Sequence, residues 1–343
     1  MTFSRKAKRT GFVILAACLL AAMCALVACS SPQASSSSKS SQVMQVSSEA
    51  QPSSSVAATG VHNVLLTGND KWDPSIPGHP DMLCILRVDL DNRTITEITV
   101  PRDTRYELPD GKATKLNDYM TEKSHEEQVK CVEQASGMKI DNYIEIGFPG
   151  LEKLVDANGG VPMNLPYDVS YHFYTEDYPD DSFTAGEQVL NGFRAMEISR
   201  ARTGYGDQDI DDQDMVRQYV CREMLTSLIQ LAYNGGVDSA TSSIKNYQDA
   251  IETDIPLETQ IAWAEKLGSQ GSFKVVGTTG PFRGDIDPDT ELWLVTPDPD
   301  GWAALKDAVE NGGDIQVALD TYQYSVFPEP TPGVVETTIK VGK

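Results

Sequence analysis

The sequence predicts an α/β fold, in which a mixed central β-sheet is flanked by helices on both faces to form an α/β/α sandwich. Short apolar runs rich in β-branched residues and bounded by turn residues occupy much of residues 62–165. Two of these runs are joined by Asp89-Leu90-Asp91-Asn92, and such turn residues favour an antiparallel hairpin. Helical spacing of apolar residues recurs between and after the runs, as in residues 215–233. Strands and a hairpin interspersed with helices favour a mixed sheet that is covered by helices.

The predicted strands share a short apolar pattern or a strict alternation of apolar and polar residues. Residues 62–68 form an apolar run that ends in glycine, which is typical of a buried strand. Residues 93–100 alternate and are rich in threonine and isoleucine. The full set of predicted strands is residues 62–68, 82–88, 93–100, 142–147, 161–165 and 273–276.

The predicted helices carry apolar residues at intervals of three and four. In residues 186–200 these are Val189, Leu190, Phe193 and Met196, which indicates one helix across the whole segment. The helix over residues 149–157 is expected to stop at the glycine pair that follows it. The full set of predicted helices is residues 122–135, 149–157, 186–200, 215–233, 240–251, 256–267 and 302–309.

The N-terminal residues 1–29 predict export and attachment to a membrane. Four cations within residues 5–9 precede an apolar run over residues 11–28, which is the layout of an export signal. Residues 26–29 resemble the lipobox of bacterial lipoproteins, with Cys29 as the lipidated residue. The alternative is an uncleaved signal anchor, because the run is close to the lower limit of roughly 17–25 residues for a transmembrane helix. Both interpretations place the rest of the chain on the extracytoplasmic face of the cytoplasmic membrane.

The remaining sequence divides into a linker, one large domain and a tail. Residues 30–60 are rich in serine and nearly lack large apolar residues, so we expect a disordered linker. Residues 61–320 are long enough for one large domain. Residues 321–343, with several prolines and threonines, are expected to be a loosely held tail.

Charge and cysteine content exclude some classes of protein. The formal net charge of −22 disfavours binding to nucleic acid. The predicted domain contains three cysteines, Cys84, Cys131 and Cys221, and this odd number argues against a disulfide framework. The alternative is one bridge plus one free thiol, because the domain is expected outside the cytoplasm. Their spacing does not match a zinc motif, so we expect buried, small apolar side chains.

Charged residues gather where the predicted strands end. Asp70 follows the first strand, Asp81 precedes the second, and Arg102-Asp103 follow the third. Arginine presents a planar fork of donors that fits phosphate oxygens, and carboxylates bind Mg²⁺ or accept the proton of an attacking hydroxyl. The pattern therefore suggests phosphate chemistry. The alternatives are that Asp70 caps a turn, that Asp81 merely flanks a strand, and that the Arg–Asp pairs are surface salt bridges.

The order of these motifs resembles the LytR-CpsA-Psr family. The resemblance rests on NVLLTGND, HPDMLCILRVDLDNRTITEITVPRDT, KLNDY, YIEIGFPGLEKLVDANGGV, FTAGEQVLNG, ISRAR and VRQ, in that order. It extends from about Asn63 to Val220, with a weaker similarity to near Val309. The PRDT element combined with the later RxR and RQ elements makes the resemblance specific.

The resemblance implies an enzyme of cell-wall assembly. Family members bind a polyprenyl-pyrophosphate-linked glycopolymer in an apolar channel, with Mg²⁺ at the head group. They transfer the polymer, such as teichoic acid, to peptidoglycan. Carried over by position, Asp70 and Asp81 would serve the metal or the incoming hydroxyl. The residues expected to clamp the pyrophosphate are Arg102, Arg200, Arg202 and Arg217, aided by Gln218 and Lys115. Asp103, in the same substrate site, would orient an arginine.

Two departures from the family pattern weaken the expected anion site. His79-Pro80-Asp81-Met82 stands where the family has Arg-Ser-Asp-Thr, and Asp214 stands where it has an arginine. Charge-assisted hydrogen bonds are worth roughly 1.5–3 kcal/mol each, so the loss of two cations matters even where His79 partly replaces the first. The alternatives to a transferase are therefore a non-catalytic envelope protein that binds polyprenyl phosphate and a lipid pyrophosphatase.

Overall fold

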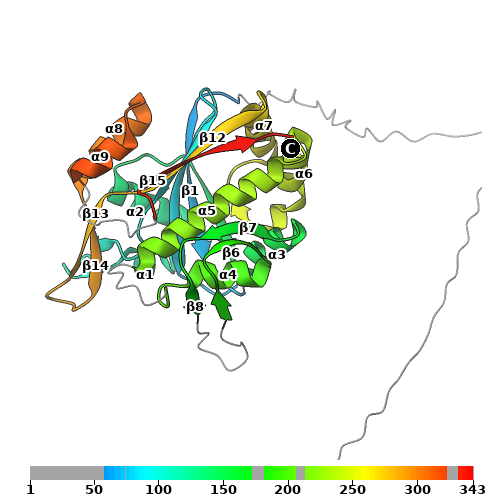
Figure 1. Cartoon of the computed structure of the whole chain (residues 1–343). Helices are drawn as coiled ribbons and strands as arrows, with labels where there is room; N and C mark the ends of the chain where they lie inside the picture. The colour runs from blue at the N-terminus through cyan, green and yellow to red at the C-terminus, as the bar shows by residue number, and fades with distance from the viewer. Residues whose placement is uncertain (1–57, 74, 172–180, 206–212, 323–330, 343) are drawn as a thin grey trace, which may run out of the picture. The chain divides into compact units, whose positions relative to one another are not determined.

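The computed structural model describes residues 58–73, 75–171, 181–205, 213–322 and 331–342 (Figure 1). The predicted anchor with Cys29, and the linker as far as residue 57, lie outside these ranges. None of the helices within the described ranges is both long enough and apolar enough to cross a bilayer.

A seven-stranded mixed sheet forms the centre of the domain. Strands β1, β2 and β3 are antiparallel neighbours, whereas β6 runs parallel to β1 and β12 runs parallel to β3. The predicted mixed sheet and its hairpin are therefore confirmed. The order of strands is β11 (Glu252–Thr253), β6 (Asn142–Gly147), β1 (Val61–Asn69), β2 (Pro80–Asp89), β3 (Thr94–Thr99), β12 (Ser272–Thr279) and β15 (Val334–Lys340).

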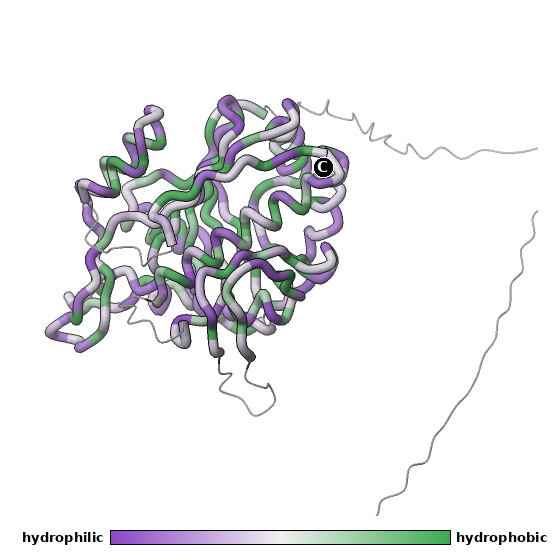
Figure 2. Tube along the Cα trace, in the orientation of Figure 1, coloured by the Kyte–Doolittle hydropathy of each residue, from purple (hydrophilic) through white to green (hydrophobic). Residues whose placement is uncertain are grey.

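Helices cover both faces of this sheet because successive side chains of a strand point in opposite directions. Val64 packs in a core with the helices on one face, and its neighbour Leu65 packs with those on the other. In Figure 1 the two groups lie on opposite sides of the sheet. The first face carries α3 (Phe148–Ala157), α5 (Gln213–Tyr233), α6 (Val237–Asn246) and α7 (Leu257–Gly268), and the second α1 (Leu116–Met120), α2 (His125–Ser136), α8 (Pro299–Asn311) and α9 (Ile315–Tyr322). Apolar and polar residues alternate along many of these helices, as expected where one side meets a sheet (Figure 2).

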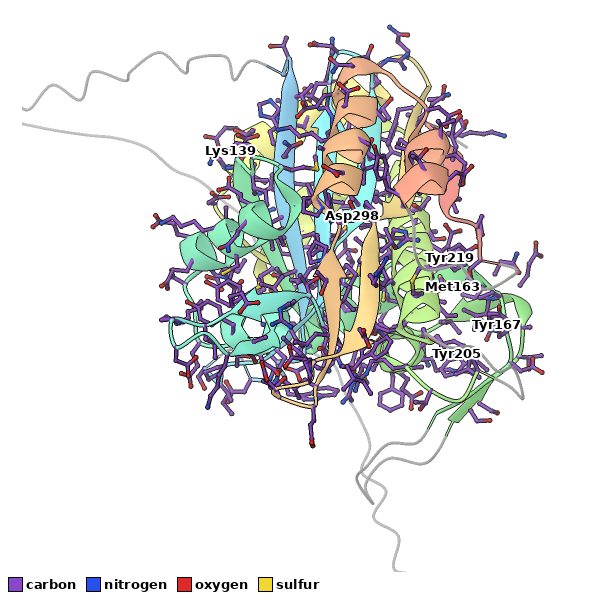
Figure 3. All side chains as sticks on the ribbon, turned by 90° about the vertical axis from the view of Figure 1, so that its left-hand side faces the viewer. Lys139, Met163, Tyr167, Tyr205, Tyr219 and Asp298 are labelled. Carbon is purple, nitrogen blue, oxygen red and sulfur yellow. The ribbon has the colours of Figure 1, made fainter. Side chains whose placement is uncertain are left out.

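A third core lies beside the N-terminal half of α5. Met163, Tyr167 and Tyr205 are buried together there, with Tyr219 of α5 on the same side of the molecule (Figure 3). The Tyr205 hydroxyl donates a 2.6 Å hydrogen bond to the Ala201 carbonyl, which fixes the chain after α4. This lobe contains α4 (Gly192–Arg200), β7 (Val161–Leu165), β8 (Val169–Tyr171), β9 (Asp181–Phe183) and β10 (Gly186–Leu190).

The prediction of one helix over residues 186–200 is wrong for residues 186–190. Residues 186–190 form β10, which pairs antiparallel with β7, and α4 begins only at Gly192. Asn191 caps this helix, because its side chain accepts a 2.9 Å hydrogen bond from the Arg194 backbone. Val189, which the helical pattern placed inside, is 65% exposed. Apolar residues over so short a segment fitted the helical period by chance.

The tail predicted to be loosely held is partly in the central sheet. Residues 334–340 form β15, which pairs with β12 from Ser272–Lys340 to Thr278–Val334. Ile339 of this strand is fully buried. Residues 323–330 of the predicted tail lie outside the described ranges.

Two short hairpins that the sequence did not predict lie beside the end of β3. They are β4 (Arg105–Glu107) with β5 (Ala113–Lys115), and β13 (Phe282–Ile286) with β14 (Trp293–Pro297). The Val295 backbone donates a 2.9 Å hydrogen bond to the Asp103 carbonyl, so the second hairpin supports the loop that carries Arg102 and Asp103.

Candidate active site

The hairpin of β2 and β3 brings Asp81 and Arg102 together. In an antiparallel pair the start of one strand lies beside the end of the other, and Cys84 is opposite Thr99. Arg102 Nη1 consequently donates a 2.5 Å hydrogen bond to Asp81 Oδ1. The Arg102 side chain is 10% exposed and that of Asp81 is 31% exposed, so the pair faces solvent through the carboxylate.

Lys115, directly before α1, and Asn117, in its first turn, bring further polar groups to Asp81 and Arg102. Lys115 Nζ lies 3.1 Å from Asp103 Oδ2, and Asp103 Oδ1 lies 3.5 Å from Arg102 Nε. Asn117 Nδ2 donates a 3.2 Å hydrogen bond to Asp81 Oδ1. The Asn117 backbone also donates to the Arg102 carbonyl at 3.1 Å, which ties α1 to the loop after β3. The sequence placed Asn117 beside Lys115 in the KLNDY element but assigned it no role in the site.

The N-terminal turn of α5 contributes Arg217 and Gln218, and both are held by Asp214. Arg217 donates from Nε at 2.8 Å and from Nη2 at 3.2 Å to the two Asp214 oxygens, and Gln218 Nε2 donates at 2.8 Å. Arg217 and Gln218 follow Asp214 by three and four residues, so their contacts with it follow from the helical spacing.

The charged side chains of this turn of α5 interact electrostatically with Asp81 and Arg102. Burial works to raise the pKa of Asp214, but the charge and hydrogen bonds of Arg217 outweigh it and lower that pKa, and Arg102 acts in the same direction. Burial works to lower the pKa of Arg217. The charge of Asp214 outweighs burial and raises that pKa, and Asp81 contributes to the increase to a smaller extent. Asp81, Arg102, Asp214 and Arg217 therefore lie within electrostatic reach of one another.

The two arginines at the end of α4 are separated by the structure. The Arg200 guanidinium lies 5.0 Å from the centre of the Phe148 ring, and Arg200 lines the apolar cavity described below. Arg202 is exposed and is not among the described residues that line this cavity. Arg200 is thus beside the site, and the role of Arg202 stays a prediction.

Asp70 lies in the loop that joins β1 to β2. Its Oδ1 accepts a 2.6 Å hydrogen bond from the His79 backbone, and its Oδ2 lies 3.6 Å from His79 Nδ1. His79 Nε2 lies 3.9 Å from Asp118 Oδ1. The turn-capping alternative therefore describes the contacts of Asp70, and its role toward a metal stays a prediction.

A largely apolar cavity of about 450 Å³ opens onto these groups. Its walls come from the first face of the sheet and from α3, α5, α6 and α7, with side chains such as Leu66, Leu86, Leu228 and Trp263. At one end it is lined by Asn69, Asp81, Arg200 and Arg217. A cavity of this kind can hold a hydrocarbon chain whose charged head reaches the arginines.

The polar end of the cavity suits an anion and an oxygen-loving cation together. Among the buried side-chain oxygens that make no hydrogen bond to the described residues, four belong to residues of this region: Asn69 Oδ1, Asp103 Oδ1, Asn117 Oδ1 and Gln218 Oε1. Each of these oxygens can accept a hydrogen bond or coordinate a cation. Mg²⁺ prefers oxygen ligands, and the donors around Asp81 therefore fit that ion.

Comparison with known proteins gives consistent relatives. The model of the LytR_cpsA_psr family matches residues 26–297. The polyisoprenyl-teichoic acid–peptidoglycan teichoic acid transferase TagV of Bacillus subtilis (strain 168) is 28% identical over 196 residues, which cover 56% of this chain and 48% of TagV. The probable cell wall biosynthesis protein LcpB of Corynebacterium glutamicum is 32% identical over 203 residues, which cover 55% of this chain and 46% of LcpB.

These matches span about half the length of each relative. The crystal structure of B. subtilis TagV is similar with a TM-score of 0.58 and 22% identity, over 76% of this chain and 98% of that one. This likeness shows that the two share the mixed sheet flanked by helices.

Proposed function

Because the chain belongs to the LytR_cpsA_psr family, we propose that it is an extracytoplasmic phosphotransferase that moves a glycopolymer from a polyprenyl-pyrophosphate carrier to peptidoglycan. TagV is named as a teichoic acid transferase that acts between a polyisoprenyl carrier and peptidoglycan. The observation that carries the proposal is the apolar cavity that ends at Asp81, Arg200 and Arg217. A lipid pyrophosphate combines a hydrocarbon tail with a strongly charged head, and this site offers surroundings for both.

The residues divide into anion-binding and positioning groups. Arg200 and Arg217 line the cavity and would bind the pyrophosphate oxygens, with Arg102 next to them. Lys115 is held by Asp103 and would add a further cation at the edge of the site. Asp214 engages two of the Arg217 nitrogens, so part of that guanidinium remains for the ligand. Gln218 would donate or accept hydrogen bonds beside it.

The proposed reaction is an in-line displacement at phosphorus. The acceptor hydroxyl oxygen forms a bond to the phosphorus that carries the glycopolymer, and the bond from that phosphorus to the bridging oxygen breaks. Polyprenyl phosphate leaves with the bridging oxygen. Asp81 is partly exposed and would receive the hydroxyl proton, while its bond to Arg102 keeps the carboxylate in place.

Mg²⁺ is part of the proposal. The oxygens of Asp81, Asn117 and Asp103 would hold it, and Asp70 would support the loop beside them. The ion would neutralise charge on the departing phosphate. We also propose attachment to the membrane through residues 1–29, either by lipidation of Cys29 or as an uncleaved anchor, and the mass of the mature N-terminal peptide distinguishes the two.

The direct test is polymer transfer from a synthetic lipid-linked donor to peptidoglycan. We expect Arg102→Ala and Asp81→Ala to lose at least about a hundredfold in rate, because each contributes to charge stabilisation in the transition state. Arg105→Ala is the matched control, since Arg105 pairs with Glu107 and Asp287. Equal activity of all three variants and the wild type would refute the assigned roles.

A second candidate function is binding of polyprenyl phosphate without transfer. It is favoured by Asp214, which occupies donors of Arg217 that a phosphate would otherwise use. Purification with bound lipid and no turnover would support it. Release of inorganic phosphate from polyprenyl pyrophosphate that carries no sugar would instead indicate a pyrophosphatase.

A further inference from the structure

A second group of metal-binding side chains lies at one edge of the central sheet. His125 is the first residue of α2, Glu145 lies in β6, and Glu252 lies in the edge strand β11. His125 Nε2 is 3.3 Å from Glu145 Oε2, and His125 Nδ1 is 3.6 Å from Glu252 Oε1. One ligand atom from each of the three lies within 4.8 Å of the other two.

This group is separate from the candidate active site. Ile144 and Ile146 line the apolar cavity, so Glu145 between them points to the other face of the sheet. The ring of Tyr143, on the same face as Glu145, stacks on the His125 ring at 4.1 Å and 11°. The imidazole is thus held in one orientation between the two carboxylates.

A positive charge between the two carboxylates would relieve their mutual repulsion. Glu252 is directly opposite Glu145 in the antiparallel pair of β11 and β6, and like charges at such positions repel. Glu145 is only 6% exposed, so solvent screens it weakly. Lys71 pairs with Glu145 Oε1 at 2.6 Å, which leaves Glu145 Oε2 facing the imidazole and Glu252.

We propose that His125, Glu145 and Glu252 form a binding site for a divalent transition-metal ion, of which Zn²⁺ is the best-fitting example. Imidazole nitrogens and carboxylate oxygens both bind Zn²⁺, and a site with three protein ligands keeps water in the fourth position. The imidazole selects against Mg²⁺ and Ca²⁺, which prefer oxygen alone. With neutral His125 and the Lys71 cation, the group has one net negative charge, which favours a dication. Lys71 keeps its bond to Glu145 Oε1 and orients that ligand.

Such an ion would join three segments that are distant in sequence. It would hold β11, a two-residue edge strand, to β6 and to the start of α2. Binding to the folded state alone raises the temperature of unfolding, and the increase grows with the logarithm of the free ion concentration above the dissociation constant. The site would therefore stabilise this edge of the sheet independently of transfer activity.

The test is titration of the full-length chain with Zn²⁺, monitored by calorimetry, in excess Mg²⁺ so that an oxygen-only site is filled. We expect one equivalent of Zn²⁺ to bind and to raise the unfolding temperature. His125→Asn and Glu252→Gln should each weaken binding at least about tenfold and correspondingly reduce the thermal shift at a given Zn²⁺ concentration. Glu126→Gln is the matched control, because Glu126 is a neighbouring exposed carboxylate that pairs with Lys130.

Two results would overturn the proposal. One is the absence of Zn²⁺ binding to the wild type. The other is binding that both His125→Asn and Glu252→Gln leave unchanged, as when cysteine thiols hold the ion. Glu252 is 63% exposed, so Glu252→Gln should fold even if His125→Asn does not, and its affinity alone then decides.

Discussion

The pairing of Asp214 with Arg217 makes a quantitative prediction about stability. The Arg217 side chain is 2% exposed, and two of its nitrogens donate to the Asp214 carboxylate. Asp214→Asn removes the negative charge but keeps a similar shape. Removing one partner of a buried ion pair typically costs about 3–5 kcal/mol, because the remaining charge is left buried without compensation.

The expected magnitude lies at the lower end of that range. Asp214 is 18% exposed, so solvent already screens part of the interaction, and Asp81 also lies within reach of Arg217. We therefore expect Asp214→Asn to lower the free energy of unfolding by about 3 kcal/mol. At roughly 2–4 °C per kcal/mol for a domain of this size, the unfolding temperature should fall by about 6–12 °C.

Urea and thermal unfolding measure this change. Two further variants provide a matched control and a double-mutant cycle. Asp238→Asn is the matched control, because Asp238 is an exposed acidic residue in the first turn of α6 and reports only the helix-dipole contribution of about 0.3–1 kcal/mol. A double-mutant cycle with Arg217→Met isolates the pair. A loss for Asp214→Asn no larger than for Asp238→Asn would contradict the reasoning.

Three other predictions follow from buried features of the domain. Burial raises the pKa of Glu97 to about 8 against the opposing charge of Arg222, so the folded state keeps a proton that the unfolded state releases near its ordinary value of 4.5. Stability should consequently fall as pH rises from about 4.5 to about 8, and this component should vanish in Glu97→Gln; identical pH profiles of the two proteins would contradict it. Leu228→Trp should narrow the apolar cavity and weaken polyprenyl phosphate binding at least about tenfold, or about 1.4 kcal/mol, measured by lipid competition, while a short-chain phosphate binds as before. Deletion of residues 334–343 should destabilise the domain by more than the roughly 1.5–3 kcal/mol that burial of Ile339 alone provides, and unchanged urea unfolding would show that β15 is dispensable.

Local sequence patterns determined most of the sheet and part of the site. The turn residues after Asp89 specify a hairpin, and a hairpin necessarily places the start of β2 beside the end of β3. The proximity of Asp81 to Arg102 was therefore available from sequence. The contact between Asp214 and Arg217 was also available, because residues three apart on a helix are neighbours.

Contacts between segments that are far apart in sequence determined the remaining strands and the remaining site residues. Residues 334–340 became an edge strand only because β12 offered an unpaired edge, and residues 186–190 became β10 only because β7 lay beside them. Arg200 and Arg202 look equivalent in sequence, yet the fold directs one to the cavity and leaves the other exposed. His125, Glu145 and Glu252 meet across more than a hundred residues of chain. Spacing along a chain fixes only contacts within a turn, a hairpin or a helix, whereas these contacts depend on which elements pack together.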